Sequence, residues 1–118
     1  ALEACKALAL KYNCVVAATG EYDYVSDGIR SAIVKNGTDM FTKITGAGCM
    51  VGALCAGAAG AFQDKFISTV SAVVSMNVAG EEACRAARLP GSFRVNLIDS
   101  IYALTEEKLM KEGNVEWL

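Results

Sequence analysis

Residues 43–49, which read Lys-Ile-Thr-Gly-Ala-Gly-Cys, lie where an apolar extended segment gives way to a helix of small residues. Gly46 and Gly48 allow the backbone to turn sharply and to approach a ligand closely. A helix that begins near Ala47 leaves its first amide N–H groups without intrahelical partners, beside the positive end of its dipole. These features predict a binding site for a phosphate group or a developing oxyanion. Cys49 falls in the first turn, where the same field favours the thiolate.

The helix expected after this loop spans residues 47–62. Residues 44–62 carry no charge, so a membrane span with Gly48 and Gly52 as a dimer motif is one alternative. The hydrophobicity of this segment rests on alanine and glycine rather than on leucine and isoleucine, and its first residues are typical of a loop. We therefore expect a helix packed on a sheet, and no membrane partner.

The segments before the loop predict a small sheet. Residues 2–12 have the apolar spacing of a surface helix, and residues 14–18 form an apolar run typical of a buried strand in a parallel sheet. The turn Thr19-Gly20-Glu21 follows that strand, and ligands of open α/β sheets bind beyond the carboxyl ends of strands. It is therefore a candidate site, with a plain polar turn as the alternative. Residues 22–41 alternate and include the hairpin signal Asn36-Gly37, which predicts a meander of short antiparallel strands.

Only helices are expected beyond residue 63. Residues 66–88 predict a second long helix, and its polar residues are interpreted as packed or exposed rather than as ligand contacts. These residues are Ser68, Ser71, Ser75 and Asn77. Ser92 is expected to cap a helix over residues 93–104. The side chains expected to face inward from that helix are Val95, Ile98, Ile101 and Tyr102. Thr105 then starts a short helix that ends near Gly113.

Composition narrows the function classes. With 118 residues, 53% of them hydrophobic and 20% charged, the chain predicts a single globular domain rather than a disordered segment. Its net charge of −2 gives no basis for nucleic-acid binding. The absence of histidine excludes catalytic triads and zinc sites that depend on it. Five cysteines without a CxxC pair fit reduced thiols in the cytoplasm better than a disulfide scaffold.

The glycine loop matches neither common nucleotide-binding fingerprint. No Gly-Lys-Ser/Thr follows it, and no acidic residue ends a following strand. A Gly-x-Gly before a helix could be only a tight turn, and a cysteine is often only a small apolar residue. The combination of the two, with the thiol in the first turn, favours a functional site.

Three segments carry a resemblance to a known family. Residues 45–49, Thr-Gly-Ala-Gly-Cys, resemble the Gly-Ala/Thr-Gly-Asp anion-hole motif of the ribokinase-like superfamily, in the cysteine form of the hydroxyethylthiazole kinase family. Residues 16–28 are similar to the Val-Thr-Gly-Glu-x-Asp-x-Val segment of that family. Residues 90–93, Pro-Gly-Ser-Phe, resemble its Gly-Pro-Gly-Ser-Phe turn, with Leu89 in place of the first glycine.

The resemblance implies a reaction and roles for particular residues. The family transfers the γ-phosphate of ATP, with Mg²⁺, to the hydroxyl of 4-methyl-5-(2-hydroxyethyl)thiazole in thiamine salvage. Thr19 matches the threonine that contacts ATP, and Gly46 matches a glycine at the thiazole. Cys49 occupies the place of the catalytic aspartate of the superfamily. The amides of Ala47, Gly48 and Cys49 would hold the γ-phosphate oxygens as charge redistributes.

Members of this family are considerably longer than this chain. The resemblance therefore implies that residues 1–118 are the C-terminal portion of a single ribokinase-like α/β domain, with a few strands, a small β meander and then consecutive helices. The half that is absent carries most of the parallel sheet, the thiazole pocket and the acidic residues that organise Mg²⁺. We expect no metal ligand in this chain and no activity from it alone. Family members form homotrimers with sites between subunits, so a trimer is the expected assembly.

Two alternatives stay open. The chain could belong to another ribokinase-like kinase, acting on pyridoxal or hydroxymethylpyrimidine, although a cysteine at position 49 argues against this. It could instead be a non-catalytic α/β interaction module in which the glycine loop is only a turn. A titration with ATP separates these alternatives, because a plain turn does not bind nucleotide.

Overall fold

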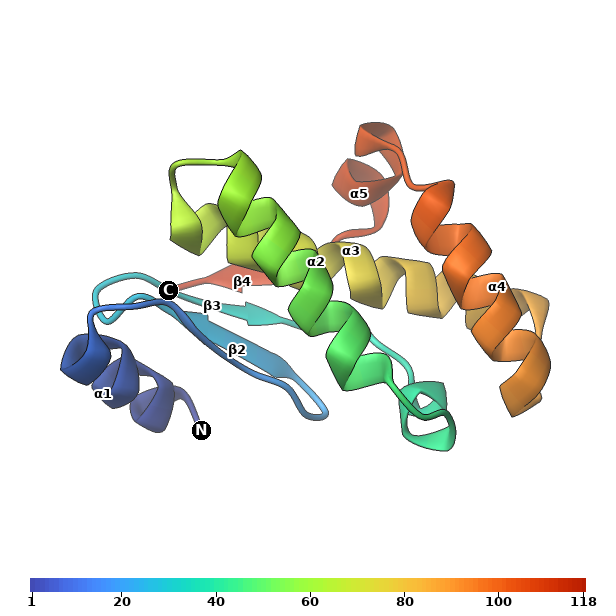
Figure 1. Cartoon of the computed structure of the whole chain (residues 1–118), viewed down its shortest axis with the longest axis horizontal. Helices are drawn as coiled ribbons and strands as arrows, with labels where there is room; N and C mark the ends of the chain where they lie inside the picture. Colours follow the sequence, from blue (N-terminus) through green and yellow to red (C-terminus); the bar gives the residue numbers. More distant parts are fainter.

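A small antiparallel sheet lies between α1 on one face and the longer helices on the other (Figure 1). The computed structural model describes all residues from 1 to 118. Its elements, in chain order, are α1 (Leu2–Tyr12), β1 (Val16–Ala18), β2 (Asp23–Ser26), β3 (Ser31–Val34), the 3₁₀ helix η1 (Asp39–Lys43), α2 (Ala47–Ala61), α3 (Lys65–Ala86), α4 (Pro90–Tyr102), α5 (Glu106–Glu112) and β4 (Val115–Trp117). The predicted α/β class is therefore confirmed.

The sheet has the strand order β1-β2-β3-β4, and every pairing is antiparallel. Val25 lies opposite both Ala17 of β1 and Ala32 of β3. β1 pairs with one strand only and Ala17 is exposed, so the buried parallel strand expected over residues 14–18 is not present within this chain. An apolar run shows that a strand can be buried but not which strands will cover it.

The main core forms between the sheet and α3. Val25 of β2 and Val34 of β3 are fully buried against Val70, Val73 and Val78 of α3. Alternate residues of a strand share a face, and residues three or four apart share one side of a helix. This register therefore places the remaining inward position of β2, Asp23, on the same face of the sheet as the apolar core.

A second core joins α3 to α4. Phe93 and Leu97, one turn apart on α4, are fully buried, whereas Val95 is 61% and Tyr102 93% exposed. The expected inward face of this helix was therefore wrong for Val95, Ile98 and Tyr102, whereas Ile101 packs against this core as expected. Its start was also wrong, because Pro90 is the first helical residue and Leu89, not Ser92, is the N-cap. Proline suits this position because its missing N–H would have had no intrahelical partner.

Two further expectations fail around the sheet. Asn36-Gly37 does not close a hairpin, and the chain continues from β3 into η1 rather than into another strand. The last strand, β4, was not expected, since only helices were predicted there. It pairs with β3, with Val115 opposite Val34 and Trp117 opposite Ala32. A three-residue strand carries too little pattern to be recognised from the sequence.

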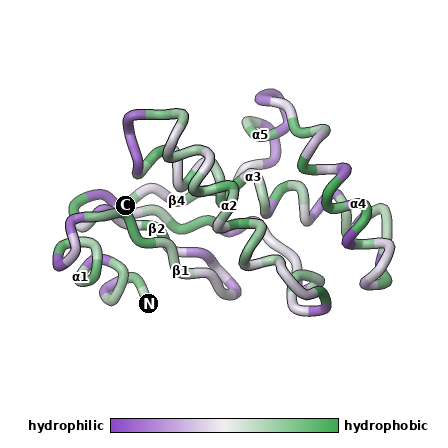
Figure 2. Tube along the Cα trace, viewed as in Figure 1, coloured by the Kyte–Doolittle hydropathy of each residue, from purple (hydrophilic) through white to green (hydrophobic).

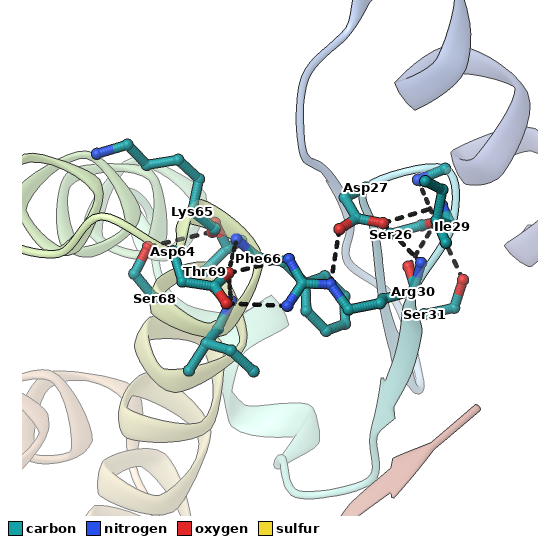
Figure 3. Close-up of polar contacts among 12 residues, drawn as sticks. Ser26, Asp27, Ile29, Arg30, Ser31, Asp64, Lys65, Phe66, Ser68 and Thr69 are labelled. Carbon is teal, nitrogen blue, oxygen red and sulfur yellow. Dashed lines mark hydrogen bonds and ion pairs between the residues drawn. The ribbon is translucent and has the colours of Figure 1, made fainter.

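An ion-pair cluster ties the β2–β3 hairpin to the start of α3 (Figure 3). The guanidinium of Arg30 lies between Asp27 and Asp64, with Nη1 at 2.9 Å and Nη2 at 3.1 Å from the two carboxylate oxygens of Asp64. Asp64 is also the N-cap of α3 and accepts the amides of Phe66 and Ile67, each at 3.1 Å. The hydrogen bond from Arg30 holds the pKa of the Asp64 carboxyl below its ordinary value.

Helix α2 lies across α3 with no fully buried residue of its own. Figure 2 shows it in green to white along its length, in keeping with its lack of charged residues. Its exposed side consists of small residues, among them Gly48, Gly52 and Gly57, where a Cβ atom would meet nothing within 4 Å. No helix is long and apolar enough to cross a membrane.

Candidate functional site

A pocket of about 650 Å³ opens between the start of α2, the turn after β1 and the segment from β3 to η1. Its residues come from parts of the chain that are distant in sequence and meet on the α3 side of the sheet. They are Thr19, Gly20, Glu21, Asp23, Asn36, Gly37, Thr38, Asp39, Phe41, Thr42, Ala47, Gly48, Val51, Met76 and Asn77. A pocket of this size suits a small-molecule ligand.

One wall of the pocket is the N-terminus of α2. Gly46 is its N-cap, with φ of +96°, a conformation that an L residue adopts only with strain. The amide of Met50 makes the first helical hydrogen bond, to the carbonyl of Gly46 at 2.9 Å, and no side chain caps the turn. The amides of residues 47–49 precede that bond, so they are donors for an anionic group. The predicted helix start at Ala47 is confirmed.

The facing wall is the turn Thr19-Gly20-Glu21, which a buried carboxylate holds in place. Oδ1 of Asp23 accepts the backbone N–H of Gly20 at 3.0 Å. Its other oxygen, Oδ2, accepts Nδ2 of Asn77 at 2.6 Å. The same amide nitrogen of Asn77 donates to the carbonyl of Asn36 at 3.0 Å. The side chain of Asn77 on α3 thus hydrogen-bonds both to Asp23, which holds the turn, and to Asn36, at the start of the segment that leads into η1.

The charges around the pocket are all negative. Glu21, Asp23 and Asp39 contribute carboxylates, and no lysine or arginine lines it. No group of three or more histidine, cysteine, aspartate or glutamate residues is placed to hold a metal ion. Within this chain, attraction for a phosphate therefore comes from backbone amides and the helix dipole. Cations that balance a triphosphate have to come from the solution or from outside these residues.

The structure brings some of the predicted site residues together. Thr19, Ala47 and Gly48 line the same pocket. Gly46 and Cys49 are next to these residues in the chain but do not line it, and Cys49 is exposed.

The sequence analysis missed a group of buried polar residues. Asp23 lies within a strand, Asn36 was assigned to a hairpin turn, and Asn77 was interpreted as a packing residue of a helix. Each of them is buried and lines the pocket. The signal that could have found Asp23 and Asn77 is a polar residue in register with an apolar face, because such a residue needs a partner in the core.

The fold and the pocket define an α/β protein with a small-molecule site between a strand turn and a helix N-terminus. The sequence profile of the hydroxyethylthiazole kinase family matches residues 1–107. The chain is 61% identical over 117 residues to hydroxyethylthiazole kinase 1 of Clostridium botulinum (strain Hall), covering 99% of this chain and 44% of that protein. It is 62% identical to hydroxyethylthiazole kinase of Clostridium kluyveri, with the same coverage.

A solved structure is similar over the same span. The hydroxyethylthiazole kinase protein from Pyrococcus horikoshii OT3 superimposes with a TM-score of 0.94 at 38% identity, over 99% of this chain and 46% of that one. The chain belongs to the hydroxyethylthiazole kinase family. It spans less than half the length of these relatives.

Proposed function

We propose that this chain is the ATP-binding and anion-hole part of a kinase that phosphorylates the hydroxyl of 4-methyl-5-(2-hydroxyethyl)thiazole in thiamine salvage. Residues 1–118 would be the C-terminal portion of one ribokinase-like domain. The observation that carries the proposal is a single pocket lined both by Thr19 and by the uncapped N-terminus of α2. The family match supplies the reaction, since relatives at 61% and 62% identity are named for it.

In the reaction proposed, the alcohol oxygen of the thiazole attacks the γ-phosphorus of ATP. A new P–O bond forms, the bond to the β-phosphate oxygen breaks, and ADP leaves. Such a transfer depends on positioning and on charge stabilisation more than on covalent help from the protein. The amides of Ala47, Gly48 and Cys49 would hold the γ-phosphate oxygens. Thr19 would contact the nucleotide from the other wall, and Gly46 would lie at the thiazole.

Cys49 is proposed to take the proton that the alcohol loses. Cys49 lies in the first turn of α2, next to the amides of Ala47 and Gly48. It is a weak base for an alcohol, so it would accept the proton late in the transfer and assist the reaction rather than be essential to it. The exposed position of Cys49 leaves its side chain open to a substrate bound from outside this chain.

Magnesium would accompany ATP, but the residues of this chain do not fit a Mg²⁺ site. Both carboxylate oxygens of Asp23 already accept hydrogen bonds, and no group of three or more histidine, cysteine, aspartate or glutamate residues is placed to hold a metal ion. We therefore derive no step through the metal and assign its ligands to the part of the kinase outside these residues.

The same part of the kinase would cover the surfaces that this chain leaves open. These are the free edge of β1, the small-residue side of α2 and the exposed apolar side of α4. A homotrimer with sites between subunits would bury more of them. We expect the chain alone to be inactive and the complete kinase to work in the cytoplasm.

The test is the mass of the product formed by the longer polypeptide that contains this chain. It is incubated with MgATP and a panel of alcohols that includes the thiazole, pyridoxal and hydroxymethylpyrimidine. We expect one phosphate to be added to the thiazole and little to the others. Phosphorylation of pyridoxal or the pyrimidine instead would agree with a ribokinase-like kinase but would refute the thiazole as its substrate. No transfer and no nucleotide binding would favour the non-catalytic interaction module.

Two variants test the role of Cys49. Cys49→Asp is expected to keep or raise kcat, because aspartate is the residue of the wider superfamily at this position. Cys49→Ala is expected to lower kcat by about a hundredfold, the lower end of the range for a positioned proton acceptor. An unchanged kcat in the alanine variant would exclude the proposed role.

A further inference from the structure

Asn77 is a polar residue in the middle of the most deeply buried helix. It is 5% exposed, and its neighbours on the same side of α3 are the apolar core residues Val73 and Val74. Its amide donates two hydrogen bonds, to Oδ2 of Asp23 at 2.6 Å and to the carbonyl of Asn36 at 3.0 Å. An apolar residue of similar shape would leave both of these buried acceptors without this donor.

Asp23, the first partner, is 6% exposed and has no cation beside it. Its hydrogen-bond donors are neutral: the side chain of Asn77 and the backbone N–H of Gly20. A buried carboxylate requires such donors, because without them its charge is not compensated. Asn77 therefore fixes the orientation of the Asp23 carboxylate through Oδ2. The carboxylate in turn fixes the position of Gly20 through Oδ1.

Gly20 lies in the middle of the turn that forms the Thr19 wall of the pocket. Residues 19–22 belong to no helix or strand, so the bond from Gly20 to Asp23 is what ties the turn to β2. The second hydrogen bond of Asn77, to the carbonyl of Asn36, ties the segment that leads into η1 to α3. One amide group on α3 thus sets the positions of two walls of the pocket relative to each other.

We propose that Asn77 is a positioning residue for the nucleotide, acting through Asp23 on the Thr19-Gly20-Glu21 turn. This rests on the proposed function, in which Thr19 contacts ATP. Asn77 holds the turn where Thr19 meets the nucleotide bound at the N-terminus of α2. Its loss weakens nucleotide binding more than it slows the chemical step, because the amides of α2 are not held by it.

The experiment measures KM for ATP, KM for the thiazole and kcat in the longer polypeptide that contains this chain. Asn77→Leu keeps the approximate shape and removes both hydrogen bonds. We expect KM for ATP to rise by about tenfold or more, the effect of losing a hydrogen bond to a charged group. We expect kcat and KM for the thiazole to stay within about twofold of the unaltered enzyme.

Asn77→Asp gives a readout that a purely structural role would not produce. It places a second carboxylate against Asp23, and the pair then retains a proton that is lost as the pH rises. We expect KM for ATP to be raised at high pH and to recover as the pH falls and the pair takes up its proton. This variant also keeps the inference testable if Asn77→Leu does not fold.

Val73→Ala is the matched control. Val73 lies one turn earlier on α3, is fully buried and does not line the pocket. It is expected to lower stability without changing KM for ATP. An increase in KM equal to that of Asn77→Leu would make the effect of Asn77 a consequence of lost stability and overturn the inference.

Binding of a non-hydrolysable ATP analogue, measured by calorimetry, separates failure of this inference from failure of the proposed function. If the unaltered protein binds the analogue and Asn77→Leu binds it equally well, the positioning role is wrong. If the unaltered protein binds the analogue but phosphorylates none of the alcohols, the proposed function fails while a weaker binding by Asn77→Leu still supports the inference. Absence of binding by the unaltered protein overturns both the positioning role of Asn77 and the proposed function.

Discussion

Replacing Asn36 tests how the sheet, α3 and the C-terminal segment are held together. Its side chain is 6% exposed and makes three hydrogen bonds. Nδ2 donates to Oε1 of Glu81 at 2.8 Å and to the carbonyl of Glu112 at 2.9 Å, and Oδ1 accepts the amide of Asn114 at 2.6 Å. Asn36→Ala removes all three hydrogen bonds and leaves the carbonyl of Glu112 and the amide of Asn114 without this partner.

The expected loss follows from these contacts. A typical hydrogen bond contributes about 0.5–1.5 kcal/mol net and one to a charged group about 1.5–3 kcal/mol, so the sum is about 2.5–6 kcal/mol. Because the groups are only partly buried, water replaces some of the lost bonds. We therefore expect the free energy of unfolding to fall by about 2–3 kcal/mol.

The assay is urea unfolding followed by the fluorescence of Trp117, the single tryptophan, which packs against Phe66. With a slope of about 1–3 kcal/mol per M, the midpoint should fall by about 1 M or more. Asn96→Ala is the control, because the Asn96 side chain donates only to the carbonyl of Ser92 within α4. A loss in Asn36→Ala no larger than in this control would refute the reasoning.

Three further changes have expected outcomes. Gly46→Ala should cost about 1–2 kcal/mol of stability because φ is +96° there, and should weaken binding of an ATP analogue, measured by unfolding and calorimetry. Gly80→Ala should move the ring of Phe41, since the new Cβ would overlap with it; a higher KM for ATP without a lower kcat is the expected readout. Arg30 lowers the folded pKa of Asp64 from 3.8, so its contribution is present above about pH 4 and is lost as the pH falls through the folded value. Asp64→Asn keeps a good cap but removes this part of the acid dependence, which pH-dependent thermal unfolding should show.

The helices whose ends carry local signals were predicted well. α1 was confirmed over Leu2–Tyr12, and α2 begins at Ala47 as the glycine loop indicates. α5 begins after Thr105, whose side chain accepts the amide of Lys108. Caps and glycine turns act within a few residues, so the sequence alone specifies them.

Features that depend on distant partners were not predicted. Asn36-Gly37 has the composition of a hairpin turn, but Asn36 is bound by residues of α3 and of the segment before β4. The inward face of α4 depends on where α3 lies, and a repeating apolar pattern on several sides of a helix leaves that choice open. Of the residues that line the candidate pocket, Thr19, Ala47 and Gly48 belong to local motifs and were named as site residues from the sequence. Asp23 and Asn77 were not, because they are 54 residues apart in the chain.

The fourth strand has a consequence for the order in which the protein is made. β4 pairs with β3 through residues such as Val34 and Val115, which are 81 positions apart. At a synthesis rate of about 5–20 residues per second, β4 is synthesised about 4–16 s after β3, and the outer edge of β3 is unpaired until then. During that interval α1 and the first three strands can form, while the hydrogen-bonding groups of β3 stay available to other nascent chains. Lys35 at the end of this edge is a charge of the kind that discourages such pairing.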